Sequence, residues 1–124
     1  MTPMQEMAQH AAQGRLALQR CDTCGTMQYP PRELCVACLS DALTWQVTGD
    51  SGGELMACTI LHHSHEPAFR TALPLRVGLV RLDPGPTAVC FLDAGSTPGC
   101  RVQITARIDA SGRAVLHATA EPPR

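Results

Sequence analysis

The chain has 124 residues, with 10 basic and 11 acidic side chains, a formal net charge of −1 and an aromatic content of 3%. This length suits one ordinary domain, or a small metal-stapled module joined to a slightly larger one. The balanced charge excludes the basic field with which nucleic-acid binders neutralise phosphates, and no apolar run approaches the roughly 20 residues that cross a bilayer.

Residues 1–20 are predicted to form a short helical docking segment. One helix face carries the apolar side chains Met4, Met7, Ala8, Ala11 and Ala12. Gly14 is expected to interrupt the helix, and Arg15–Arg20 then leads into the next segment as a strand. A helix this short is marginal alone, so it must dock on its own chain or on a partner, and the sequence leaves both open.

Residues 21–42 contain the strongest chemical signal, two C-x₂-C pairs separated by ten residues. The pairs supply four thiolates, and these predicted metal ligands are Cys21, Cys24, Cys35 and Cys38. Four soft ligands fill a tetrahedral coordination sphere, which predicts a zinc ribbon whose metal is structural, not catalytic. Free or disulfide-bonded cysteines are the alternative, and iron of the rubredoxin type uses the same ligands. Iron sites usually have their two pairs further apart, which favours zinc.

The cysteine count also indicates the compartment. Seven cysteines, an odd number with four assigned to metal, fit a reducing cytoplasm better than an oxidising one. The N-terminal segment lacks a charged start followed by an apolar core, so we expect no secretory signal there. The sequence therefore predicts a cytoplasmic protein.

From residue 43 onward the pattern is that of β-strands. The expected strands are Leu43–Val47, Glu54–His62, Leu75–Leu82, Thr87–Leu92, Arg101–Ile108 and Arg113–Thr119. Glu54–His62 is apolar on both faces and is predicted to be a central, buried strand that follows a turn at Gly49–Gly53. Arg101–Ile108 alternates cleanly, as expected of a half-buried strand.

Short strands without intervening helices predict a mainly β fold that ends in a small barrel. Residues 43–120 are assigned to a five-stranded Greek-key barrel of the OB type, and residues 121–124 to an extended or disordered tail. Periodicity alone leaves an SH3-like barrel open.

The order of these segments resembles one family in particular. The matching stretches, which span nearly the whole chain, are Gly14–Arg32, Cys35–Cys38, Leu43–Trp45, Gly49–Gly53, Leu55–Leu61 and Pro74–Pro86. They resemble the DUF35 family, small proteins with a rubredoxin-like zinc ribbon followed by an OB-fold domain.

The resemblance implies a role as a non-catalytic partner of a thiolase-fold enzyme. Such enzymes act on CoA thioesters by thiolysis, Claisen condensation, acyl transfer or retro-aldol cleavage. The small subunit is then expected to complete or shield the acyl-CoA site, and no catalytic residue is expected in this chain.

Two further groups of side chains are candidates for binding. His63 and His65 point the same way on an extended segment, and they are candidates for an interface or a second metal site, or belong to a plain polar loop. Every basic residue is arginine, which binds phosphate in a bidentate manner. Arg70 and Arg76 are therefore candidates for contact with CoA or with the partner, the alternative being a solvated polar face.

Two rival functions remain open at this point. Zinc ribbons joined to OB barrels are common in proteins that bind single-stranded nucleic acid, but such barrels need a basic groove with stacking aromatics. A stand-alone enzyme that uses the histidines of His62–His65 is the other rival.

Overall fold

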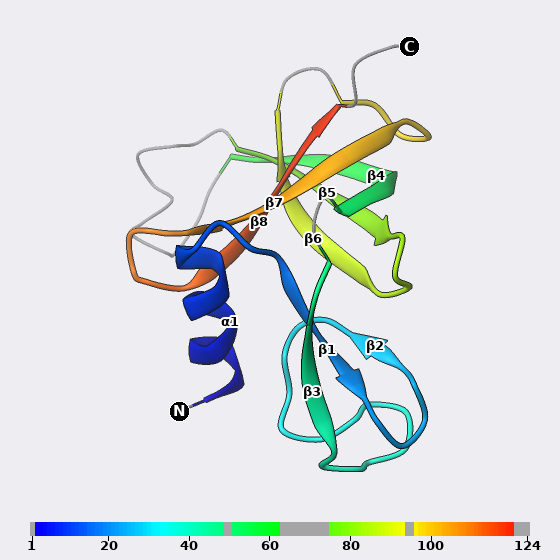
Figure 1. Ribbon diagram of the computed structural model, residues 1–124. Helices are drawn as coiled ribbons and strands as arrows, with labels where there is room; N and C mark the ends of the chain where they lie inside the picture. The colour runs from blue at the N-terminus through cyan, green and yellow to red at the C-terminus, as the bar shows by residue number, and fades with distance from the viewer. Residues whose placement is uncertain (1, 49–50, 63–74, 94–95, 121–124) are drawn as a thin grey trace.

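The computed structural model describes residues 2–48, 51–62, 75–93 and 96–120. One helix, α1 (Pro3–Ala12), precedes a three-stranded sheet and a closed five-stranded barrel (Figure 1). The strands are β1 (Ala17–Cys21), β2 (Met27–Gln28), β3 (Leu43–Val47), β4 (Ser51–Leu61), β5 (Leu75–Leu82), β6 (Thr87–Leu92), β7 (Arg101–Ile108) and β8 (Ala114–Ala120). The mainly β class is confirmed. Within the described residues no helix has the length and apolar character needed to span a membrane.

Helix α1 begins with a complete capping box. The Gln5 backbone N–H donates to Thr2 Oγ1 at 3.2 Å, and the Thr2 N–H donates to Gln5 Oε1 at 2.8 Å. Pro3 occupies the first turn, where its missing N–H costs nothing. Met7 and Ala11 are buried against the body of the protein, and the helix packs on β1, β7 and β8. The helix therefore docks on its own chain.

The first sheet has the strand order β2-β1-β3. β3 runs antiparallel to β1, with Cys21 opposite Leu43 and Ala17 opposite Val47. The sequence analysis placed Leu43–Val47 at the start of the barrel segment, and in the structure this strand pairs with β1 as the third strand of the first sheet. An alternating pattern predicts a strand but does not name its neighbour. Here the second cysteine pair returns the chain to the end of β1, and β3 then pairs along it.

The second sheet closes into a barrel with the order β4-β5-β6-β8-β7. β6 and β8 are parallel, with Phe91 opposite His117, and the other pairs are antiparallel. A crossover between the third and fifth barrel strands is the Greek-key connection of an OB fold. The expected OB barrel is confirmed over the SH3-like alternative.

β4 differs from the sequence prediction at both ends. It begins at Ser51, so Gly52 and Gly53 of the expected turn lie within the strand, and a Cβ on Gly53 would lie 2.7 Å from the Arg81 carbonyl oxygen. The prediction that both faces of this strand are buried was wrong. Leu55 is fully buried, but Met56 is 40% and Ile60 49% exposed. The reason is that α1 covers β7 and β8, and no described element covers the outer face of β4.

One hydrophobic core joins the three parts of the molecule. The buried members of this core are Met7, Ala11, Leu16, Leu18, Leu55, Val80, Leu82, Ala88, Cys90, Val102, Ile104, Ala114, Leu116 and Ala118. The helix and the start of β1 thus pack on the barrel, whereas the two cysteine turns lie at the far end of the ribbon (Figure 1). That end is where the candidate metal site is built.

Candidate metal centre and docking surfaces

The fold brings the four predicted cysteine ligands to one point. Their Sγ atoms all lie within 4.8 Å of one another, and the Cys21–Cys38 and Cys24–Cys35 Sγ pairs are each 3.6 Å apart. Bonds of about 2.3 Å in a tetrahedron give sulfur–sulfur edges of about 3.8 Å. The set fits a tetrahedral metal ion and offers no fifth position, so it is a structural site. The four thiols are free, with no disulfide among the described cysteines.

The two cysteine turns, or knuckles, have the same backbone design. In the first knuckle the Gly25 N–H donates to the Cys21 carbonyl at 2.8 Å, and in the second the Leu39 N–H donates to the Cys35 carbonyl at 2.9 Å. Both donors have left-handed backbones, with φ of 80° at Gly25 and 65° at Leu39. Glycine adopts this conformation freely, whereas for leucine it costs about 1–2 kcal/mol. The second knuckle therefore holds local backbone strain.

Two buried glutamines hold the second knuckle in place. Gln28 accepts a hydrogen bond from the Val36 N–H at 2.9 Å and donates to Gln19 Oε1 at 2.9 Å. Gln19 in turn accepts from the Arg32 N–H at 2.7 Å and donates to the Arg32 carbonyl at 2.8 Å. Sequence analysis missed both residues. They could have been predicted from their positions, because each is a glutamine in a strand beside a metal-binding loop. The backbone N–H and C=O groups of such a loop need hydrogen-bond partners.

Local hydrogen bonds prepare the Cys24 thiol for metal. Cys24 Sγ lies 3.1 Å from Thr26 Oγ1, and the hydrogen bonds from the side chain and then the backbone of Thr26 lower the pKa of Cys24 to about 6. Because the thiolate is the form that ligates, this shift favours metal binding. The hydroxyls of Thr23 and Ser40, 2.9 Å apart, tie the two knuckles together.

The other predicted site residues are not gathered into one site. His63, His65 and Arg70 lie outside the described residues. The Arg76 guanidinium donates to the Asp93 carbonyl at 2.6 Å and to the Ser96 carbonyl at 2.8 Å. Arg76 thus fastens the loop between β6 and β7 to β5.

Two cysteines outside the ribbon, Cys58 and Cys90, differ in their surroundings. Burial raises the pKa of Cys90 to about 12, which keeps it a neutral, apolar side chain. Cys58 is exposed, and its Sγ lies 3.9 Å from Arg76 Nη2. Among the described residues, neither thiol has a histidine as a hydrogen-bond partner.

The uncovered outer face of the barrel carries an apolar patch. Ala57, Leu79 and Val89 lie opposite one another on β4, β5 and β6, and Leu79 is 39% and Val89 64% exposed. They border a hollow of about 220 Å³. Exposed apolar area of this kind is typical of a protein interface.

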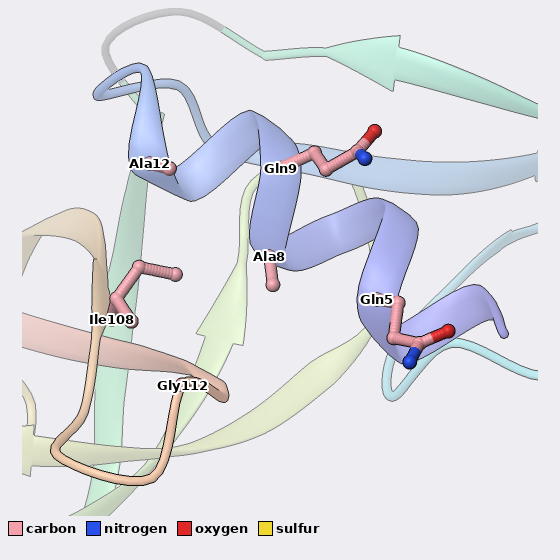
Figure 2. A pocket seen from close by; sticks show the side chains of 6 residues that line it. All are labelled: Gln5, Ala8, Gln9, Ala12, Ile108 and Gly112. Atoms are coloured by element: carbon pink, nitrogen blue, oxygen red, sulfur yellow. The ribbon is translucent and has the colours of Figure 1, made fainter. Parts of the chain in front are cut away.

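A second hollow of about 590 Å³ lies between α1 and the β7–β8 hairpin (Figure 2). Gln5, Ala8, Gln9 and Ala12 line it from the helix, and Ile108 and Gly112 line it from the hairpin. A third, of about 290 Å³, contains Arg107 and His117 beside Phe91. Burial, and then the Arg107 charge, lowers the pKa of His117.

Fold and site together define a four-cysteine ribbon joined to an OB barrel. Residues 8–44 match the family model described as the rubredoxin-like zinc ribbon domain of ChsH2, and residues 45–107 match the C-terminal OB-fold domain of ChsH2. The chain belongs to the ChsH2/DUF35 family.

Three known proteins place the chain further. A chain of the solved Ltp2-ChsH2(DUF35) aldolase matches with a TM-score of 0.73 and 25% identity, over 93% of this chain and 91% of that one. A DUF35 protein of unknown function from Sulfolobus solfataricus shares the fold, with a TM-score of 0.65 and 17% identity over 94% of this chain and 83% of that one. A protein of Thermomonospora curvata named as a probable enoyl-CoA hydratase alpha subunit is 36% identical over 83 residues. That match covers 66% of this chain but only 25% of the relative's length.

Proposed function

We propose that this protein is a non-catalytic accessory subunit of a thiolase-fold enzyme that acts on CoA thioesters. The observation that carries the proposal is the match of nearly the whole chain to nearly the whole of one chain in the Ltp2-ChsH2(DUF35) aldolase. A metal, which we take to be zinc, fixes the ribbon. The partner supplies the nucleophile and the oxyanion hole, and this subunit completes the acyl-CoA site and shields it from water.

The chemistry of the relatives narrows the reaction. An enoyl-CoA hydratase adds water across a double bond and yields a 3-hydroxyacyl thioester. A retro-aldol cleavage breaks the bond between C2 and C3 of such a thioester. The names of the two relatives therefore support cleavage of a 3-hydroxyacyl-CoA over thiolysis, condensation or acyl transfer.

The surface of the barrel supports a protein partner over nucleic acid. Its uncovered face presents the exposed aliphatic side chains Leu79 and Val89, and the chain as a whole is not basic. We assign this face to the enzyme partner. Arg70 and Arg76 remain candidates for CoA phosphate, and His63 and His65 for the interface. The reduced thiols suit a cytoplasmic location.

The test is co-purification followed by reconstitution. A tagged chain is isolated from its native cells at moderate salt, and proteins that co-elute are identified by mass spectrometry. We expect a thiolase-fold protein in a near-stoichiometric amount, and cleavage of 3-hydroxyacyl-CoA by the pair but not by either protein alone.

Two variants locate the surfaces in the same assay. Val89→Asp should prevent complex formation, whereas Arg76→Met should leave the complex intact and raise KM for the thioester. Activity of the isolated chain, or recovery only with nucleic acid that salt removes, would overturn the proposal.

A further inference from the structure

The second knuckle has a leucine where the first has a glycine. Leu39 makes the same turn-closing hydrogen bond as Gly25 and has the same left-handed backbone, yet its side chain is 72% exposed. A glycine there would remove the strain, and the leucine gains little burial within its own chain. The benefit of a leucine side chain at this position must therefore come from a contact with another molecule.

Two more exposed aliphatic side chains belong to the same loop as Leu39. Leu34 is 46% and Val36 63% exposed, and the loop is closed by a 2.8 Å hydrogen bond from the Cys35 N–H to the Ser40 carbonyl. The metal ligands and Gln28 hold this loop, so the three aliphatic side chains project from a rigid base. We call Leu34, Val36 and Leu39 the knuckle tip.

The ribbon segment that carries the knuckle tip, residues 20–41, has a negative net charge. Asp22, Glu33 and Asp41 are exposed, and they outnumber the arginines of this segment, Arg20 and Arg32. Arg20 Nη1 lies 3.3 Å from Asp22 Oδ1, which neutralises that carboxylate. Four thiolates around a divalent ion add two further negative charges. An apolar tip with an acidic rim is complementary to an apolar socket with a basic rim.

We propose that the knuckle tip inserts into an apolar, basic-rimmed socket on the enzyme subunit, with Leu39 as its anchor; this rests on the proposed function. A second copy of the chain is the poorer occupant, because two acidic tips repel each other. The likeness to a chain of the Ltp2-ChsH2(DUF35) aldolase favours an enzyme over a second copy. The barrel face and the knuckle tip would then hold the partner at two separate points.

The test is Leu39→Gly in the full-length, zinc-loaded chain. Glycine removes the strain, so we expect full zinc content and an equal or higher melting temperature. We expect affinity for the thiolase-fold partner to fall about 10- to 100-fold, as loss of one well-buried leucine contact predicts. Added salt should weaken binding of wild type and of Leu39→Gly alike, because the substitution changes no charge.

Two control variants separate strain from docking. Val47→Thr changes another exposed apolar side chain of the ribbon, 46% exposed and away from the tip, and should bind as wild type does. Gly25→Leu places leucine in the same backbone at the first knuckle, where the nearest atom is Arg20 Nη2 at 3.9 Å. It should lower the melting temperature without tightening binding.

The outcomes separate the two proposals. If Leu39→Gly binds the partner with wild-type affinity, or if the wild-type chain self-associates through Leu39, the tip proposal is wrong and the proposed function stands. If wild-type chain fails to bind any thiolase-fold enzyme, the proposed function itself fails.

Discussion

Removal of the metal should unfold the ribbon and leave the barrel folded. Of residues 21–42, the buried ones are Cys21, Gln28, Pro31 and Cys35, so half of what this segment buries is metal ligand. Binding of structural zinc contributes about 10–16 kcal/mol to the folding free energy of small zinc modules. The free energy of unfolding of a whole typical domain is about 5–15 kcal/mol. The remaining contacts of the segment cannot replace a contribution of that size.

A single tryptophan allows the ribbon to be observed alone. Trp45 is the only tryptophan of the chain and lies in β3. Its indole N–H donates a hydrogen bond to Glu6, and the centroids of its ring and the His10 ring are 5.7 Å apart. On chelation we expect its emission to shift to the red, while far-UV circular dichroism retains the barrel signal. Cys38→Ser should behave like the chelated protein, and Cys58→Ser, which changes an exposed cysteine, like wild type.

Two results would refute this reasoning. Unchanged Trp45 emission after complete metal loss would mean that side-chain contacts alone hold the ribbon. Loss of the barrel signal together with the ribbon signal would mean that the shared core, through Leu16 and Leu18 of the ribbon side, makes the molecule one cooperative unit.

Three further predictions concern individual side chains. Gly78→Ala should lower barrel stability by about 1–3 kcal/mol in thermal melts, because its Cβ would lie 2.6 Å from Leu55 Cδ1. Gln28→Ala should cost about 1–3 kcal/mol by leaving the Val36 N–H unpaired, and Trp45 fluorescence in urea should show an earlier ribbon transition. Burial lowers the pKa of His117 below its ordinary 6.5, so the unfolded chain takes up this proton first and stability falls as pH drops through about 6.5. His117→Gln should flatten that part of the stability profile, and an unchanged profile would contradict the assignment.

The sequence predicted the metal ribbon well because its signal is local. Two C-x₂-C pairs define their ligands by spacing, and the structure places all four sulfurs within 4.8 Å. The barrel strands were also found, since alternation and turn residues mark them within a few positions. Strand partners were harder: β3 has the same pattern whether it pairs with β1 or with a barrel strand, and only the folded chain decides.

Burial on the outside of the barrel could not be predicted from the strand alone. Met56 and Ile60 gave β4 the pattern of a strand covered on both faces, and within this chain nothing described covers them. If a partner covers this face, the burial predicted from the sequence is that of the complex, and the exposure seen in the structure is that of the chain alone. Prediction and structure then differ at the surface that the partner covers.

Leu39 extends the same argument to the ribbon. The sequence shows that glycine follows one cysteine pair and leucine the other, but it gives no sign that the two positions share a left-handed backbone. Structure alone shows a strained, exposed leucine and gives no reason to keep it. Gly25 and Leu39 close equivalent turns. The melting temperatures of Gly25→Leu and Leu39→Gly therefore measure the backbone strain of a leucine at each turn within one molecule. Relief of strain does not itself weaken binding. A loss of partner affinity in Leu39→Gly is therefore due to the lost contact at the interface.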